Sequence, residues 1–150
     1  MLTLLRTNSQ NLDFKTLIKL LDKGLKITDG DDHDFYNQFN KIENIKYVVI
    51  IYEDKVAVGC GAIKKFSEKI VEVKRMYVAE NQRGRGAASM ILQELEQWAV
   101  ELSFENCILE TGTRQIEALK LYPKNGYSVI ENYGQYAGIE NSVCFEKPLL

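Results

Sequence analysis

Two glycines flanked by arginines mark the segment of this sequence that is best suited to binding a charged ligand. The segment, Gln82-Arg83-Gly84-Arg85-Gly86-Ala87-Ala88-Ser89, stands between a strand-like stretch, Ile70–Val78, and a long amphipathic stretch with helical spacing. Glycine permits the left-handed backbone of a tight turn, and the first amides of a helix lack partners within it. These amides and the positive end of the helix dipole attract anions. The spacing therefore predicts a site where backbone N–H groups hold a diphosphate.

Two common kinds of phosphate-binding loop do not fit this segment. The loop Gly-x-x-x-x-Gly-Lys-Ser/Thr is excluded, because no Gly-Lys-Ser or Gly-Lys-Thr occurs in the sequence. A dinucleotide-binding turn needs a third glycine where this chain has Ser89, and it belongs to an opening βαβ unit. The residues do match Arg/Gln-x-x-Gly-x-Gly/Ala, as Arg83-x-x-Gly86-x-Ala88. This pattern resembles the coenzyme A loop of the GNAT N-acetyltransferase family.

A second motif lies farther along the chain. Its residues are Gln115-x-x-Ala118-x-x-Leu121-Tyr122-x-x-x-Gly126-Tyr127, similar to the family pattern Asn-x-x-Ala-x-x-Phe/Leu-Tyr-x-x-x-Gly-Phe/Tyr. The chain departs from that pattern where Gln115 replaces the usual Asn and where Pro123 follows the tyrosine. With two motifs at compatible spacing, each on the expected element, the chain is identified as a member of the GNAT family.

The hydrophobic spacing around these motifs predicts strands and helices over nearly all 150 residues. Strands are expected at Leu2–Leu5, Lys46–Tyr52, Lys55–Ile63, Ile70–Val78, Asn106–Glu110, Gly126–Ile130 and Ser142–Lys147. Helices are expected from Asn11 to near Gly24, over Phe35–Phe39, from Ala88 to Leu102 and over Arg114–Tyr122. Because no linker or repeat interrupts this series, residues 1–150 are expected to form one domain.

The order of these elements resembles the GNAT fold. The resemblance implies an α/β (α+β) architecture: a mixed, mostly antiparallel sheet of six to seven strands, about four helices, and central strands that splay apart. The strand–helix–strand unit that joins Ile70–Val78 to Asn106–Glu110 by itself predicts a parallel pair. Gly59 and Gly61, inside a predicted strand, indicate a bulge or the close approach of another backbone.

Several residues set expectations for the helices. Asn11 is suited to cap the first helix. In the long helix the apolar stripe leaves Glu94, Glu96 and Glu101 on the side expected to face solvent. Pro123 is expected to end the last helix.

The resemblance implies acetyl-CoA as the co-substrate, bound in the cleft where the central strands separate. The pantetheine arm would pair with the strand edge at Met76, Tyr77 and Val78. The diphosphate would lie on the loop residues Arg83, Gly84, Arg85, Gly86, Ala87, Ala88 and Ser89. The two arginines add positive charge there, or else are exposed and solvated. Gln115 touches the pantetheine or merely begins its helix.

The resemblance also implies acyl transfer from a thioester to a primary amine. An alkylammonium has a pKa of about 10, so it must lose a proton before it attacks. Glu72 stands at the family's general-base position; alternatively it is a strand-face carboxylate paired with Lys74 or Arg75. Tyr122 would protonate the departing thiolate, or else covers the core. A backbone N–H near Met76, freed by a bulge, would polarise the thioester carbonyl.

No covalent enzyme intermediate is expected. A cysteine nucleophile would need a histidine partner, and the only histidine, His33, lies far from the cysteines in sequence.

Acceptor specificity is placed by the resemblance in the first two helices and in the loop before the last strand. Tyr36, Tyr133 and Tyr136 are the candidate substrate contacts there, although residues of this kind in such places more often belong to the scaffold or the surface than to a ligand contact. The acidic run Asp29–Asp34 is a helix-capping turn or an acidic rim that attracts an amine, and its spacing excludes an EF-hand calcium loop. A small amine, an amino acid, a polyamine and a peptide N-terminus all remain open.

The expected function is therefore an acetyl-CoA-dependent N-acetyltransferase that acts on a small-molecule primary amine. Two alternatives share the fold: a CoA-binding sensor or interaction module without turnover, and a protein or peptide acetyltransferase. Fold alone does not separate these functions.

Composition narrows the partners. With 19 Lys and Arg against 21 Asp and Glu, the net charge is −2, which argues against a nucleic-acid partner. The cysteines Cys60, Cys107 and Cys144 are odd in number and lie in apolar runs, typical of buried free thiols in a reducing compartment. Without a Cys/His cluster or a long apolar run, neither a metal nor a membrane partner is expected, and the cytoplasm is the expected location. The resemblance is compatible with a homodimer.

Overall fold

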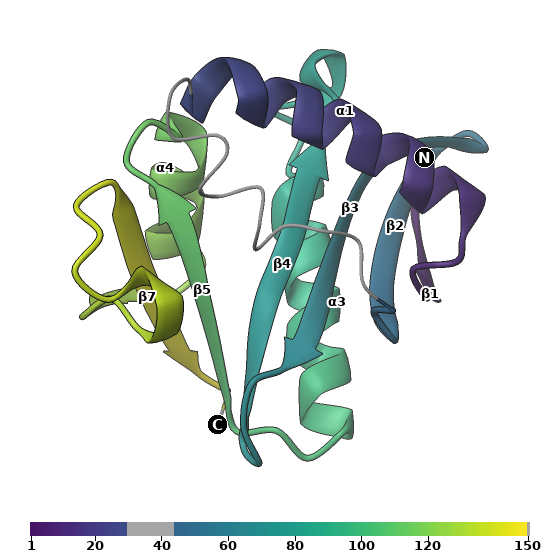
Figure 1. Cartoon of the computed structure of the whole chain (residues 1–150). Coiled ribbons are helices and arrows are strands. Elements are labelled where there is room, and N and C mark those ends of the chain that lie inside the picture. Colours follow the sequence, from purple (N-terminus) through teal and green to yellow (C-terminus); the bar gives the residue numbers. More distant parts are fainter. Residues whose placement is uncertain (30–43, 150) are drawn as a thin grey trace.

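The structure, a computed structural model, describes residues 1–29 and 44–149. It contains one seven-stranded sheet in the order β1-β2-β3-β4-β5-β7-β6 (Figure 1). The strands are β1 (Leu2–Thr7), β2 (Tyr47–Glu53), β3 (Val56–Lys65), β4 (Ile70–Val78), β5 (Asn106–Gly112), β6 (Ser128–Ile130) and β7 (Ser142–Pro148). Every neighbouring pair is antiparallel except β4 and β5, which are parallel. The predicted sheet and its parallel pair are confirmed.

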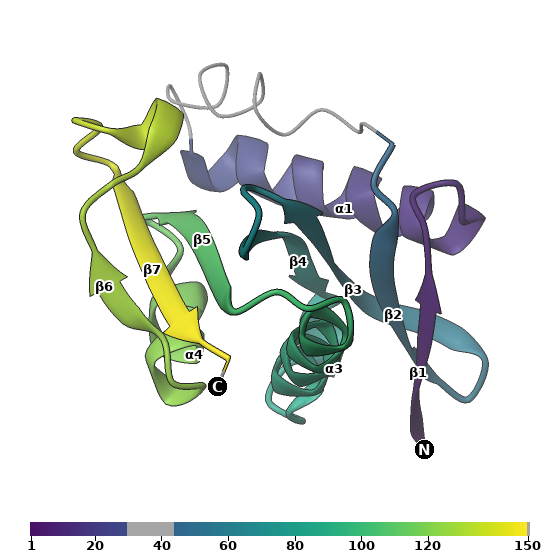
Figure 2. The ribbon, with the colours of Figure 1, turned by 90° about the horizontal axis from the view of Figure 1, so that it is seen from below.

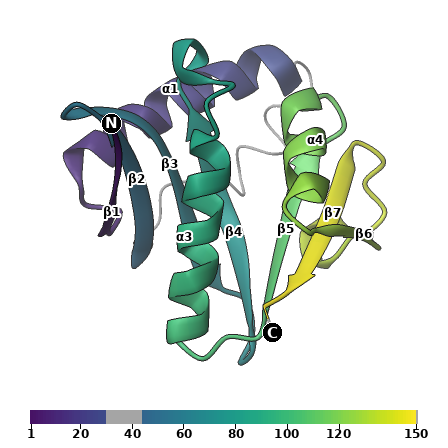
Figure 3. The same ribbon diagram turned by 180° about the vertical axis from the view of Figure 1, so that it is seen from behind.

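Helices cover both faces of the sheet. Helix α1 (Leu12–Asp29) lies on one face, whereas α3 (Ala87–Glu101) and α4 (Ile116–Lys124) lie on the other (Figures 2 and 3). These are the three α-helices of the described residues, against the four or so that were expected. The predicted helix over Phe35–Phe39 falls outside the described residues, as do residues 30–34 of the acidic run. No helix in the described part of the chain is both long and apolar enough to cross a lipid bilayer.

Helix α1 begins as predicted but runs farther. The backbone N–H of Phe14 donates a hydrogen bond of 3.1 Å to Asn11 Oδ1, which confirms the cap. The helix continues past Gly24 to Asp29, because an interior glycine costs a helix only about 1 kcal/mol, which packing can outweigh. Phe14 and Ile18 are fully buried in a cluster that includes residues of β2 and β3.

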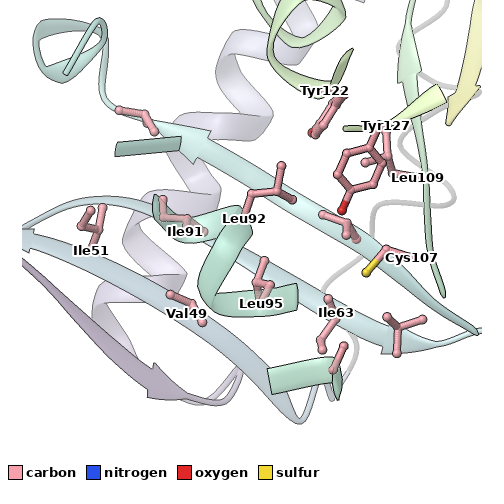
Figure 4. Close-up of a cluster of buried hydrophobic side chains, with 14 of the residues drawn as sticks. Val49, Ile51, Ile63, Ile91, Leu92, Leu95, Cys107, Leu109, Tyr122 and Tyr127 are labelled. Carbon is pink, nitrogen blue, oxygen red and sulfur yellow. The ribbon is translucent and has the colours of Figure 1, made fainter. Parts of the chain in front are cut away.

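The core between the sheet and α3 holds the long helix in place. Ile91, Leu92 and Leu95 are fully buried in one cluster with side chains of β2 and β3, among them Val49 and Ile63 (Figure 4). The same cluster extends through β5 to two tyrosines, one in the last turn of α4 and one just after that helix. Burial of this apolar face, at about 25 cal/mol per Å², fixes the start of α3 relative to the sheet.

One residue of α3 does not face solvent as expected. Glu96 is buried, 9% exposed, and accepts hydrogen bonds from Tyr127 Oη at 2.9 Å and Lys147 Nζ at 2.8 Å. Burying a carboxylate is tolerated when a cation and a hydroxyl compensate for the lost water, and both partners come from distant segments. Glu94 and Glu101 remain partly exposed, and both pair with Arg6.

The end of α4 also differs from the prediction. The helix was expected to stop at Pro123, but it includes that proline and ends at Lys124. Gly126, with φ of +91°, closes it instead: the N–H groups of Gly126 and Tyr127 donate to the carbonyls of Pro123 and Tyr122, at 3.1 and 3.0 Å. These are the two bonds of a Schellman motif, which needs a left-handed residue after the helix. Pro123 removes a donor but does not set the end of the helix.

The central strands separate as predicted. Strand β4 pairs with β5 over three positions only, from Ile70↔Asn106 to Glu72↔Ile108. Beyond them β4 continues to Val78 and β5 to Gly112, and the two diverge towards α1 (Figure 1). One edge of β4 is therefore left without its parallel neighbour beyond Glu72.

A bulge in β4 lies in the same stretch. The β3–β4 register passes from Cys60↔Tyr77 to Ala62↔Lys74, so that Gly61 faces both Arg75 and Met76. Arg75 has φ of +61°, a left-handed conformation that is uncommon for a residue other than glycine. This confirms the bulge that the strand glycines indicated.

Gly61 is required where the bulge meets α3. A Cβ atom on Gly61 would lie 2.5 Å from Met76 Sδ and 2.8 Å from Ile91 Cγ2. We expect Gly61→Ala to lower the free energy of unfolding by about 1–3 kcal/mol, because the core would be overpacked. Urea denaturation measures this loss.

The matched control is Gly24→Ala, since no atom lies within 4 Å of a Cβ built on that helical glycine. This variant should be neutral or more stable by up to about 1 kcal/mol. Equal stability of the two variants would contradict the packing assigned to Gly61.

Candidate active site

The glycine-rich loop places unpaired amides at the start of α3. Gly84 and Gly86 have φ of +82° and +79°, so both take the left-handed backbone that favours glycine. Gly86 is the N-cap residue of α3, and no side chain caps the helix. In the described part of the chain, no hydrogen bond is formed by the amides of residues 84–89. Amides in this arrangement at a helix N-terminus suit an anionic ligand.

The two arginines of the loop lie differently. Arg83 Nε donates to the carbonyl of Val78 at 2.9 Å, which holds the loop against the end of β4. Arg85 instead points to Gln82 and to Glu53, whose Oε2 lies 3.2 Å from Arg85 Nη2. Arg83 therefore lies against the end of β4, whereas Arg85 turns towards Glu53.

A groove of about 600 Å³ runs along this loop, between the free edge of β4 and α4. Its walls include ten of the eleven predicted cofactor contacts: Met76, Tyr77, Val78, Arg83, Gly84, Gly86, Ala87, Ala88, Ser89 and Gln115. Arg85 is the exception. The contacts predicted from the sequence come from β4, from the loop and from the N-cap of α4, and the fold places these ten residues around one groove.

The opposite wall of the groove carries cations that the sequence analysis missed. Lys120 and Lys124 of α4 and Arg114 just before it line the groove. The signal was present, because lysines four residues apart share one face of a helix. The missing information was which face of α4 turns towards the loop.

A second hollow, of about 150 Å³, lies between the splayed parts of β4 and β5 and beside α1. It is lined by both candidate catalytic residues, Glu72 and Tyr122, and by Tyr136. Met76 and Tyr122 line this hollow and the groove alike. The two spaces therefore meet at the bulge of β4, opposite the end of α4.

Glu72 is buried, 9% exposed, and held by neighbours. Tyr133 Oη donates to Glu72 Oε2 at 2.5 Å, and Lys74 Nζ lies 3.8 Å from Oε1. Lys74 and Arg75 were the two possible partners of the Glu72 carboxylate. Lys74 is the one that lies close to it, whereas Arg75 pairs with Asp22.

The three candidate substrate contacts have different positions. Tyr136 lines the smaller hollow, whereas Tyr133 contacts Glu72 and stacks edge-on between Phe66 and Tyr136, with centroids 5.3 and 5.8 Å away. Tyr36 lies outside the described residues. Burial, followed by the charge of Glu72, raises the pKa of Tyr133, so this hydroxyl keeps its proton and remains a donor to the carboxylate.

Tyr122 is buried at the end of α4, against Tyr127 and Phe145. Within the described residues its hydroxyl makes no hydrogen bond, although the residue lines both hollows. Burial, with a smaller contribution from Glu110, raises the pKa of Tyr122 above that of a free phenol. At neutral pH this group can therefore donate a proton or a hydrogen bond.

The cysteines are poorly suited to nucleophilic chemistry. Cys60, Cys107 and Cys144 are free and buried, and burial raises the pKa of Cys60 and of Cys107 to about 12. Their thiols stay protonated at neutral pH, whereas the thiolate is the reactive form. In the part of the chain that the structure describes, no group of three or more His, Cys, Asp and Glu side chains is placed to hold a metal ion.

Comparison with known proteins identifies the family. Residues 14–127 match the model of the acetyltransferase (GNAT) family. The IAA acetyltransferase of Azospirillum brasilense is 37% identical over 93 residues, which make up 61% of each chain. The uncharacterized N-acetyltransferase YsnE of Bacillus subtilis is 31% identical over 100 residues, 65% of this chain and 66% of that protein. The chain thus spans slightly less than two thirds of these two curated relatives.

Solved structures agree over the whole chain. A crystal structure from Klebsiella pneumoniae, assigned there as an acyl-CoA N-acyltransferase, superposes with a TM-score of 0.82 at 28% identity and covers 100% of this chain and 99% of that one. The PaiA N-acetyltransferase of Thermoplasma acidophilum, solved with coenzyme A, gives a TM-score of 0.73 at 16% identity, covers 99% of both chains, and shows the shared fold. The chain belongs to the GNAT acetyltransferase family, which confirms the resemblance.

The buried tyrosines predict a loss of stability in alkaline solution. Burial raises the pKa of Tyr122 and of Tyr133 above the 10.0 of a free phenol. The folded protein keeps these protons when the unfolded chain releases them, so their stabilisation is complete below pH 10 and declines as the pH rises further. The decline should reach about 1.4 kcal/mol per pH unit for each such tyrosine.

Urea denaturation at pH 8, 10 and 11 measures this decline, with Tyr122→Phe as the comparison. The variant has one titrating phenol fewer, so its free energy of unfolding should fall less steeply above pH 10. Parallel curves for wild type and variant would show that Tyr122 is not protected from ionisation.

Proposed function

We propose that this chain is an acetyl-CoA-dependent N-acetyltransferase that transfers the acetyl group directly to the primary amine of a small molecule. The supporting observation is the meeting of the two hollows at Met76 and Tyr122. The larger one runs along the uncapped amides of residues 84–89, and the smaller one contains Glu72. The two hollows therefore adjoin, one beside the free amides of the loop and the other beside Glu72.

The groove fits the donor in charge and shape. The amides of residues 84–89 would hold the diphosphate, with Arg83 on the same side and Lys120 and Lys124 on the opposite wall. The pantetheine arm would add to the free edge of β4 at Met76–Val78, where β5 no longer pairs with it. This arrangement aims the thioester at the point where the hollows meet.

The smaller hollow supplies the groups that acyl transfer requires. Glu72 would take the proton from the ammonium, directly or through water, while Tyr133 fixes the orientation of the carboxylate. The amine nitrogen would then attack the thioester carbonyl, whose oxygen is polarised by a backbone N–H at the bulge near Met76. As the C–S bond breaks, Tyr122 would give its proton to the thiolate and would regain one from the nitrogen, which loses its second proton as the amide forms.

The size of the smaller hollow supports a small acceptor. At about 150 Å³ it is well below the roughly 300–1,000 Å³ of pockets for drug-sized ligands. A CoA-binding module without turnover would need neither the hollow nor a buried carboxylate within it.

The diphosphate site is tested by a pair of variants at Gly86. Asn and Asp both tolerate its left-handed backbone, and they differ by one charge. Gly86→Asp should weaken coenzyme A binding by tenfold or more relative to Gly86→Asn, because a carboxylate would lie beside the diphosphate. Isothermal titration calorimetry with CoA gives both affinities. Equal affinities would exclude the loop as the diphosphate site.

Turnover is tested with Tyr122→Phe and Glu72→Gln. General acid–base catalysis contributes about 10²- to 10⁴-fold, so each variant should lose at least 100-fold in kcat. Because neither side chain is assigned to the diphosphate, CoA affinity should change by less than about threefold. Release of free CoA from acetyl-CoA with a panel of primary amines provides the measurement. A wild-type protein that binds CoA but acetylates no amine would favour the module without turnover.

A further inference from the structure

A buried cation in the smaller hollow remains unexplained by the proposed reaction. The side chain of Arg75 is only 3% exposed, although it belongs to the bulged residue of β4. Its Nη1 lies 3.1 Å from Asp22 Oδ1, and Nη2 is buried without a hydrogen-bond partner in the described residues. A buried donor without a partner loses the hydrogen bonds that water gave it, so such groups are rare unless they serve a purpose.

The conformation of Arg75 is held in place from several sides. Asp22 of α1 binds one end of its guanidinium, and Cys60 Sγ donates to its backbone carbonyl at 3.4 Å. Burial lowers the pKa of Arg75, but a guanidinium starts so high that it stays charged in proteins. The hollow therefore has a fixed positive charge in its wall.

The surroundings of Arg75 have both signs of charge. Arg75 and Lys74 line the hollow together with Glu72 and Glu110. A ligand with only positive charges, such as a polyamine, would place a second cation next to Arg75, which like-charge repulsion disfavours. A ligand with one negative and one positive group would place its negative group beside the two cations and its positive group beside the two carboxylates.

We propose that the acceptor is a small molecule with a carboxylate next to its primary amine, that is, an α-amino acid. The carboxylate would accept a hydrogen bond from Arg75 Nη2 and lie near Lys74, while the amine would face Glu72. The guanidinium suits this role because its five N–H donors allow one carboxylate, that of Asp22, on one side and a second on the other. This inference rests on the proposed function and names its substrate class.

The volume of the hollow limits the amino acid. A cavity of about 150 Å³ is comparable to an engineered one that holds benzene. The acceptor should therefore be a compact amino acid with a short side chain. A peptide N-terminus has a neutral carbonyl in place of the carboxylate, so it could accept a hydrogen bond from Arg75 Nη2 but would bring no negative charge to the guanidinium.

The test compares matched acceptors with the full chain and acetyl-CoA. Alanine, alaninamide and ethylamine differ in the group next to the amine and have similar size. We expect kcat/KM for alanine to exceed that for each of the other two by about 10- to 100-fold, the usual value of a hydrogen bond to a charged group. The lower amine pKa of alaninamide favours its deprotonation, so this bias works against the expectation.

Variants assign the preference to Arg75. Arg75→Lys keeps the positive charge but loses the planar set of N–H donors, and Arg75→Met loses both. Each variant should reduce the preference for alanine by tenfold or more. Lys65→Met, which removes an exposed cation elsewhere on the hairpin, should leave the preference unchanged. CoA affinity, measured in each variant, shows that the protein is folded. Arg75→Lys still allows the comparison where Arg75→Met does not fold.

Two outcomes would overturn the inference in distinguishable ways. Acetylation of ethylamine or alaninamide as efficiently as alanine, or an unchanged preference in folded Arg75→Lys, would overturn it and leave the proposed function standing. Failure to acetylate any member of the panel, although CoA binds, would overturn the proposed function and this inference together.

Discussion

The short pairing between β4 and β5 is the constraint on which the site depends. The two parallel strands share only three residue pairs before they separate, and β4 bulges at Arg75 and Met76 just beyond that point. A continuous sheet would satisfy every backbone group of β4 and leave no room for a ligand. Because the strands separate, one strand edge becomes available, and a groove and a smaller hollow open on either side of Met76.

Helix ends define the rest of the site, and the two helices end in different ways. Helix α3 starts at Gly86 without a side-chain cap, so its first amides remain available to an anion. Helix α4 ends in a Schellman motif at Gly126, which satisfies its last carbonyls and keeps Tyr122 in helical geometry next to Pro123. The start of α3 thus keeps free amides, whereas the end of α4 is closed by backbone hydrogen bonds that hold Tyr122 in place.

Buried charges are paired unequally in this fold. Glu96 has both a cation and a hydroxyl, and the network joins α3 to the last two strands. Arg75 has a single partner, Asp22, which leaves one of its nitrogens unpaired within the described residues. The first arrangement fits a structural role, since nothing remains for a ligand to satisfy. The second lies in the wall of a hollow, where an unpaired donor favours a ligand with an acceptor of its own.

The sequence by itself determined the elements and the loop. Strong periodicity predicted Ile70–Val78 without error, and the glycine spacing gave a loop whose predicted contacts, except Arg85, line one groove. Local patterns are reliable where neighbours along the chain decide the outcome, as at the Asn11 cap. Only the tertiary structure decided that Glu96 is buried, that Arg85 turns to Glu53, and that Lys120 and Arg75 face the hollows. Each of these depends on a partner or a facing element from a distant part of the chain, and local spacing contains no information about which segments the fold brings into contact.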